Sequence, residues 1–212
     1  ILFCDRRVID FGTIPVGFKK IDTIVIRNNS NKEMELLMDV LPLSSAFNFL
    51  SILKRIEPGK EKSFTVSFEP VNVQKFNEAM KIYAENSINI TLKGESVYPE
   101  VNVHHNNQTY MDIAGALIGD TVEGSFALEN KCEFDLNFEL TIDAQGAKNP
   151  SGKCPFVFLP NKGTLNKFET KAIKVLFQPE IASINYFACV NVYIEGLKTP
   201  KQLFIKSVAS AS

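Results

Sequence analysis

The sequence has few of the residues from which catalytic and metal sites are built. It has no tryptophan and only two histidines, the adjacent pair His104 and His105. Its four cysteines are scattered, with no close pair, at Cys4, Cys132, Cys154 and Cys189. Because a structural zinc site needs closely spaced pairs of ligands, we expect no metal site and four reduced thiols.

Motifs of enzymatic chemistry are also missing. The sequence contains no glycine-rich phosphate loop, no G-x-S-x-G and no H-E-x-x-H. The two histidines stand in a polar run, His104–Thr109, which we interpret as a solvated linker, with a hinge or a hairpin turn as the alternative. The carboxylates occur singly, usually beside lysine, as Glu61 does between Lys60 and Lys62. We therefore predict a protein that is not an enzyme, with no catalytic, cofactor-binding or metal-binding residues and no cofactor.

Neither sign of charge is in excess. The chain has 23 Lys and Arg against 24 Asp and Glu, a net charge of −1, and the balance is similar in its two halves. Nucleic acids, anionic membranes and acidic tubulin tails select proteins with basic faces. We therefore expect no nucleic-acid partner and no strong direct binding to microtubules.

A long hydrophobic run is absent as well. The longest charge-free apolar stretch is Ile181–Ile194, which three polar residues interrupt. A membrane-spanning helix needs about 20 apolar residues, so we expect no membrane insertion. No signal peptide is visible. The chain begins at Ile1 without a methionine, and we expect it to be a segment of a longer protein.

The pattern that is present has a period of two. Apolar and polar residues alternate in three clear stretches, at 64–68, 88–92 and 188–194. Such alternation is typical of strands with one buried face. Turn residues separate the stretches, for example Pro58-Gly59 and Asn161-Lys162-Gly163. Many short strands at this spacing predict a β-sandwich, with short helical turns possible only near Leu43–Leu53.

The chain also repeats itself. At an offset of 102 residues, 24–28 matches 126–130 and Val16-Gly17 matches Ile118-Gly119; at 109 residues, 64–70 matches 173–179. The difference, 109 − 102 = 7 residues, predicts an insertion in the second half, which we place in the loop 144–153. A repeat of this length is the size of a domain. We predict two tandem β-sandwiches, residues 1–98 and 99–212.

Five strings in the first half carry a family resemblance: Val8–Gly17, Ile24–Ser30, Ile56–Gly59, Phe64–Pro70 and Ile90–Gly94. Together they resemble the ASH domain of hydin, the microcephaly spindle protein and centrosomal scaffolds, which is related to the major sperm protein (MSP) domain. The second half departs from the pattern, since Ala114 replaces Gly12 and Lys167-Phe168 replaces Pro58-Gly59. The second half is assigned to the same family because it repeats the first half, rather than because it matches the motif.

The resemblance implies an all-β fold with two immunoglobulin-like sandwiches of about seven strands each. It implies a non-catalytic structural and protein-interaction segment of a larger scaffold. The expected partners are other axonemal or centrosomal proteins. The expected location is the cytoplasmic cytoskeleton, either the axoneme of a cilium or flagellum, in its central apparatus, or the centrosome and basal body.

Two other functions remain open. Relatives of the MSP domain at membrane contact sites bind acidic peptides in a basic groove, but the corresponding stretches here, 33–39 and 134–140, are acidic and would repel such a peptide. An extracytoplasmic sandwich of the chaperone type is permitted by three glycosylation sequons, at Asn28, Asn89 and Asn107. The scattered cysteines disfavour it.

The junction between the halves generates a prediction about shape. Residues 95–110 contain Pro99 and no glycine, whereas a flexible linker is rich in glycine and serine. We expect the last strand of the first sandwich to lead almost directly into the second, which gives a stiff, roughly end-to-end rod. Small-angle scattering should show a single elongated particle. A broad distribution of distances between the halves would contradict a stiff junction.

Overall fold

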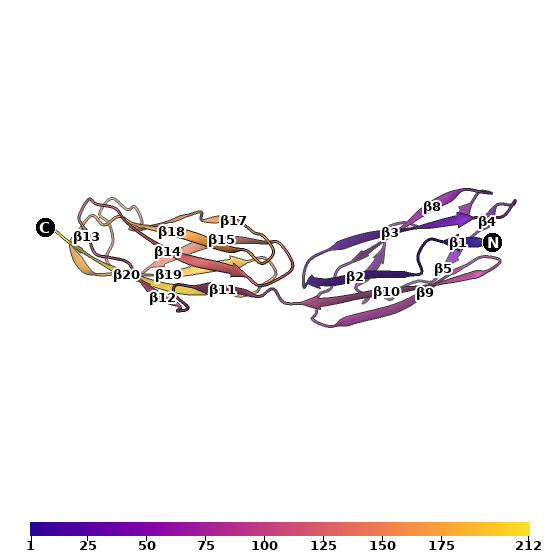
Figure 1. The fold of residues 1–212 in the computed structure, drawn as a ribbon, viewed down its shortest axis with the longest axis horizontal. Coiled ribbons are helices and arrows are strands. Elements are labelled where there is room, and N and C mark those ends of the chain that lie inside the picture. Colours follow the sequence, from indigo (N-terminus) through magenta and orange to yellow (C-terminus); the bar gives the residue numbers. More distant parts are fainter. The chain divides into compact units, whose positions relative to one another are not determined.

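The computed structural model describes all 212 residues, and they form strands, turns and loops. The predicted all-β class is confirmed, and no helix that could cross a membrane is present. The chain divides into two compact units, Ile1–Tyr98 (unit 1) and Pro99–Ser212 (unit 2). Each unit is described separately below, with the strand labels of Figure 1.

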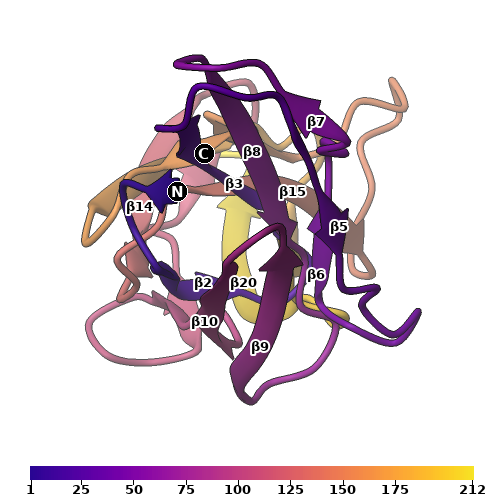
Figure 2. The same ribbon diagram turned by 90° about the vertical axis from the view of Figure 1, so that its right-hand side faces the viewer.

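Unit 1 consists of two four-stranded sheets and a small ribbon. The first sheet has the order β1 (Leu2–Cys4), β3 (Lys20–Asn28), β8 (Glu61–Phe68) and β6 (Phe47–Phe49). The second has the order β2 (Val8–Pro15), β10 (Ser87–Val97), β9 (Lys75–Tyr83) and β5 (Leu37–Met38). The ribbon pairs β4 (Met34–Glu35) with β7 (Arg55–Ile56). Figure 2 looks onto this unit end-on and shows the two layers.

Unit 2 repeats this order of strands. Its first sheet has the order β11 (Val101–His104), β14 (Val122–Asn130), β18 (Thr170–Phe177) and β16 (Phe156–Leu159). The second has the order β12 (Tyr110–Asp112), β20 (Lys201–Ser210), β19 (Ser183–Ile194), β15 (Leu136–Ala144) and β17 (Lys162–Leu165), and β13 (Ala116–Leu117) also pairs with β20.

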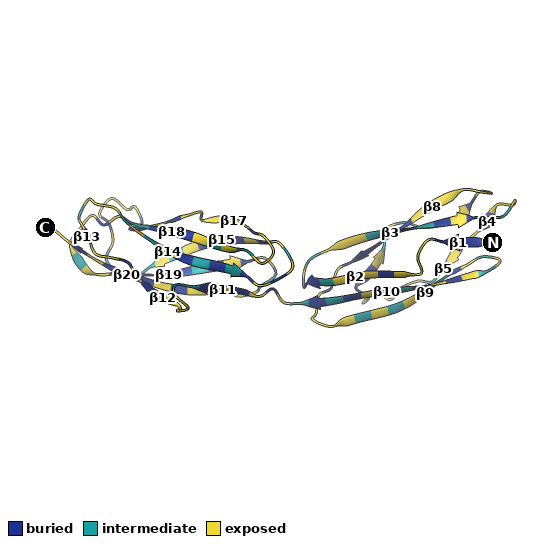
Figure 3. Ribbon diagram, in the orientation of Figure 1, coloured by how far each residue is buried: buried dark blue, intermediate teal, exposed yellow.

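The alternation seen in the sequence is the alternation of burial in the structure. Along β10, Ile88, Ile90 and Leu92 are fully buried while the residues between them are exposed or half-buried, as the colours of Figure 3 show. Successive side chains of a strand point to opposite faces of the sheet, so each strand contributes one row to the core. Burial of these rows is the main favourable contribution to folding.

Phenylalanines fill the core of unit 1. The rings of Phe47 and Phe68 stack at 5.0 Å between centroids, and Phe11 lies 5.5 Å from Phe68. A side chain at Gly94 on β10 would overlap the Phe68 ring, which explains why a glycine ends the Ile90–Gly94 string. Unit 2 repeats the stacked pair as Phe156 and Phe177, at 5.1 Å.

A buried asparagine closes the same loop in each unit. Asn28, fully buried at the end of β3, donates from Nδ2 to the carbonyls of Lys32 (2.7 Å) and Ile56 (2.9 Å). Asn130, at the end of β14, donates to the carbonyls of Phe134 (2.7 Å) and Asn166 (3.0 Å). Each side-chain oxygen accepts a backbone N–H two residues later. The side chain therefore replaces backbone partners that the turning chain lacks. Because Asn28 is buried, the sequon at this position is not accessible.

The paired residues also locate the predicted insertion. Met34 pairs with Ile56, and Leu136 pairs with Leu165, so the offset is still 102 residues at Leu136. Phe47 pairs with Phe68 as Phe156 pairs with Phe177, so the offset has reached 109 residues at Phe156. The extra residues therefore lie between Leu136 and Phe156, an interval that includes the loop 144–153.

The interpretation of His104–Thr109 as a solvated linker is wrong, and the alternative, a hairpin turn, is confirmed. His104 ends β11, and the backbones of His105 and Gln108 exchange two 2.9 Å hydrogen bonds around Asn106 and Asn107. Both asparagines have positive φ, 48° and 62°, as a type I′ turn requires. The run is therefore a tight turn within unit 2. Only three residues, Tyr98, Pro99 and Glu100, separate β10 from β11.

Truncation of Phe68 should destabilise one unit and not the other. Phe68→Ala removes a fully buried ring that contacts Phe11 and Phe47, and we expect a loss of about 3–5 kcal/mol in the stability of unit 1. Hydrogen exchange should accelerate within residues 1–98 alone. Phe177→Ala is the matched change in unit 2 and should give the opposite pattern. Equal loosening of both halves in either variant would show that the two cores are not independent.

One turn of unit 2 holds a strained residue that a glycine would relieve. In unit 1, Glu57 O accepts from Lys60 N across Pro58-Gly59, and Gly59 has φ +69°. The equivalent turn, from Asn166 to Glu169, puts Phe168 at φ +56°, with its ring 64% exposed. Positive φ is costly for a residue with a bulky side chain.

Phe168→Gly should therefore stabilise unit 2 by about 1 kcal/mol, because the strain removed exceeds the entropy that glycine adds to the unfolded chain. Gly59→Ala in unit 1 should destabilise by a similar amount. Urea denaturation of both variants measures the two changes. A destabilised Phe168→Gly protein would mean that the exposed ring makes contacts worth more than the strain.

Candidate functional site

The two units differ most at one edge of the second sheet. In unit 2, β15 pairs with β19 along seven residues, from Phe138 opposite Ile194 to Ala144 opposite Ala188. Beyond Ala144 the chain still pairs with β19, because Gln145 N donates to Phe187 O and Ala147 N donates to Asn185 O. In unit 1, the matching strand β5 has only two residues, Leu37 opposite Tyr83 and Met38 opposite Ile82.

The edge of β9 is therefore open beyond Lys81. Asp39 N donates to Lys81 O at 3.0 Å, and this is the last backbone hydrogen bond on that edge. Because alternate residues of a strand direct their N–H and C=O groups to the same side, Ala79 and Asn77 present theirs to the open edge. Both residues are exposed. Their equivalents in unit 2, Cys189 and Phe187, are covered by Asp143 and Gln145.

The local sequence explains why β5 stops. The carboxylate of Asp39 accepts the Lys81 N–H at 2.9 Å, in the place of a backbone carbonyl, and accepts the Tyr83 hydroxyl at 3.0 Å. The second bond raises the pKa of the Tyr83 hydroxyl. Three residues later, Pro42 has no N–H to donate. In unit 2 the matching positions are Thr141 and Ala144, which continue the strand.

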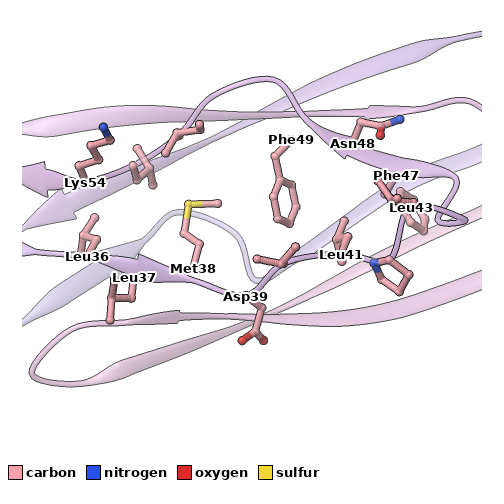
Figure 4. Close-up of a pocket in the computed structure, with 14 residues that line it drawn as sticks. Leu36, Leu37, Met38, Asp39, Leu41, Leu43, Phe47, Asn48, Phe49 and Lys54 are labelled. Atoms are coloured by element: carbon pink, nitrogen blue, oxygen red, sulfur yellow. The ribbon is translucent and has the colours of Figure 1, made fainter.

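The chain that leaves β5 forms one wall of an apolar groove. The groove has a volume of about 490 Å³ and is lined mainly by residues 36–43 on one side and 47–54 on the other (Figure 4). Several apolar side chains stand in water around it: Val40 is 91% exposed, Ile52 is 78% exposed and Leu43 is fully exposed. Exposed apolar residues that gather around one groove mark an interaction surface rather than ordinary surface variation.

Lysines surround the open edge of β9. Lys75 and Lys81 lie on β9 itself, and Lys93 lies on β10 opposite Asn77. None of the three is in an ion pair; the lysines that form ion pairs are Lys171, Lys174 and Lys206, all in unit 2. The edge therefore presents unpaired backbone groups beside lysines that form no ion pair, with Glu95 opposite Lys75 and Asp10 opposite Lys93 in the sheet.

The histidines and cysteines are placed apart from this region. His104 lies 3.6 Å from Glu129, and His105 Nδ1 lies 2.9 Å from the carbonyl of Ser125, both in unit 2. Burial raises the pKa of the Cys4 and Cys189 thiols, so neither is an activated thiolate. No group of three or more His, Cys, Asp and Glu residues could hold a metal ion.

Sequence reasoning named no site residues, and it missed the groove and the open edge. A signal was present in Asp39-Val40-Leu41-Pro42-Leu43, where the alternation breaks and a proline falls inside an apolar run. That signal alone could not distinguish an exposed interaction loop from a buried connection. The distinction needed the partner strand β9, which lies about 40 residues further along the chain.

Residues 1–95 match the model of the HYDIN/CFA65/VesB-like, Ig-like domain family. Cilia- and flagella-associated protein 74 of Chlamydomonas reinhardtii is 24% identical over 177 residues, 81% of this chain and 9% of that protein. Mouse cilia- and flagella-associated protein 65 is 26% identical over 200 residues, 93% of this chain and 10% of that protein. The chain thus spans about a tenth of the length of these relatives.

Among solved structures, the ASH/PapD-like domain of human CEP192 aligns with 53% of this chain and 86% of its own, at 17% identity and a TM-score of 0.45. The family match and the curated relatives confirm the resemblance to Ig-like domains of hydin-type ciliary proteins.

Proposed function

We propose that this chain is a non-catalytic structural and protein-interaction segment of a larger ciliary protein, located in the axoneme. The observation that carries the proposal is the apolar groove of unit 1, bordered by Val40, Leu43 and Ile52, which are all exposed. The matched relatives are cilia- and flagella-associated proteins, and the chain spans a small part of each, as a segment of a long scaffold would.

We further propose that residues 1–98 and 99–212 are two copies of one domain, the second more divergent. The support comes from contacts in residues 1–98 that recur at equivalent positions in residues 99–212. Asn28 and Asn130 close the same loop, and the Gly17 and Gly119 amides donate to the carbonyls of Pro70 and Pro179, each at 3.1 Å. The two units share the order of strands in both sheets.

The function follows from what each copy presents. The second sheet of unit 2 is extended by β15 and β17, so its strand β19 is covered. Unit 1 leaves its groove and the edge of β9 exposed. Unit 1 is therefore the docking module in this proposal, and unit 2 is the spacer. The partner is another axonemal protein, and the central apparatus is the proposed position within the axoneme.

Retention in the axoneme tests the proposal. The tagged chain is expressed in ciliated cells, which are then extracted with detergent, and we expect the wild-type chain to remain with the axoneme. Leu43→Asp with Ile52→Asp should release most of it, because two charges enter the apolar groove at exposed positions where stability changes by about 0.5 kcal/mol or less.

Val71→Asp with Ile184→Asp is the matched control, since both residues are exposed and lie outside the groove. This control should be retained like the wild-type chain. Purified microtubules should not bind the wild-type chain with sub-micromolar affinity, because neither half is strongly basic: 13 − 12 gives +1 for residues 1–98, and 10 − 12 gives −2 for residues 99–212. Equal retention of the groove variant and the control would remove the groove from the proposal.

A further inference from the structure

We propose that the open edge of β9 binds an extended segment of a partner protein as an added antiparallel strand. The segment alternates apolar residues, which face the core, with acidic or polar residues, which face outward. This inference rests on the proposed interaction role of unit 1 and names the edge and the chemistry of the partner. The argument comes from the backbone, from the chain's own loop and from the charges.

The backbone groups of the edge are ready for a strand. Ala79 and Asn77 direct their N–H and C=O groups to the open side, and no hydrogen bond from within the chain reaches them. A row of unpaired N–H and C=O groups on an exposed strand pairs readily with another extended chain. In unit 2 the same edge holds such a strand, residues 141–147, so the sandwich has space for one.

The chain cannot fill this edge with its own loop. Asp39 uses its carboxylate to accept the Lys81 N–H, which ends the ladder, and Pro42 has no N–H. Val40 and Leu43, which would continue the strand, extend into water instead. The missing strand must therefore come from another chain.

The covering strand of unit 2 shows which side chains fit. In the part of β15 that covers the matching edge, Ile142 and Ala144 are half-buried on the inner face, while Asp143 is exposed on the outer face. In unit 1 the inward side chains would lie beside Met80, which is buried, Glu78, whose carboxylate accepts from Ser45 Oγ at 2.9 Å, and Phe76, which is half-buried and contacts Phe47. An apolar residue is therefore favoured on the inward face of the added strand.

The solvent-facing side chains of β9 favour acidic residues on the outer face of the added strand. Lys75 and Lys81 project on this face of β9, without an ion-pair partner, on either side of the open positions. Acidic residues at directly opposite or diagonal positions would pair with them. The sequence led us to expect that the acidic stretch 33–39 would repel an acidic peptide. Glu33 pairs with Arg55 and Glu35 lies on β4, whereas the negative carboxylate of Asp39 lies beside Lys81. Acidic residues of the added strand are therefore favoured at the Lys75 end of the edge.

A second copy of this chain is disfavoured as the occupant. Two copies that paired through β9 would bring Lys75 and Lys81 of both edges together, and like charges across a strand pair are unfavourable. Lysine on an edge strand is a common protection against such self-pairing. The occupant that satisfies both the backbone and the charges is an acidic-apolar strand of a different protein.

The probe is a fluorescent peptide with the sequence of residues 140–147, the strand that covers the matching edge in unit 2. We expect it to bind the 212-residue chain in an anisotropy titration and to protect the Ala79 and Asn77 amides from hydrogen exchange. Two methylated peptides test the geometry. N-methyl groups at Asp143 and Gln145 block the amides that would face β9 and should weaken binding at least about tenfold.

N-methyl groups at Ile142 and Ala144 point away from β9 and should leave the affinity within about threefold. In the protein, Lys75→Glu with Lys81→Glu should weaken binding about fivefold to tenfold, because Asp143, the acidic residue of the peptide, is then repelled. Lys60→Glu with Lys62→Glu makes the same change of charge away from β9 and should have no effect.

Three results would overturn the inference. They are no binding at about 1 mM peptide, equal binding of the two methylated peptides, and a dimer of the chain with protection at Ala79 and Asn77. If either of the first two results were found while the chain was still retained in axonemes, the strand-addition site would be wrong and the proposed function would stand. If the groove variant lost retention in the axoneme but still bound the peptide, the groove and the β9 edge would be two independent sites.

Discussion

Every extended strand must find partners for its N–H and C=O groups, and this constraint shapes the whole chain. Within the sheets the partners are neighbouring strands. At the ends of β3 and β14, where the backbone turns away, the side chains of Asn28 and Asn130 supply them. At Ala79 and Asn77 of β9 neither is available, and the backbone presents open groups at an exposed edge.

The two units differ in how they cover the edge strand of the second sheet. Unit 2 extends β15 through Ala144 and covers β19, whereas Asp39 and Pro42 end the equivalent strand of unit 1 after two residues. The interruption both uncovers β9 and sends an apolar loop outward to form the groove. One local change therefore distinguishes the unit that we propose for docking from the unit that we propose as a spacer.

The chemistry of the chain agrees with such a role. The histidines contact Glu129 and a backbone carbonyl, burial raises the pKa of two thiols, and no cluster of metal ligands forms. What the molecule does present is shape and hydrogen-bonding capacity: a groove, an edge and unpaired lysines. In a ciliary scaffold these would give a fixed point of attachment, because strand pairing and groove contacts persist without turnover.

The sequence by itself determined the class of the fold, since a period of two can bury one face only in strands. It also determined the repeat, the Pro58-Gly59 turn and the family resemblance, because turn and core residues recur at fixed offsets. Tertiary structure alone decided the site and the place of His104–Thr109. Pairing between β5 and β9 joins residues about 40 positions apart, and no local pattern reports where such a pairing stops. The physical reason is that an edge is defined by an absent neighbour, which only the assembled sheet reveals.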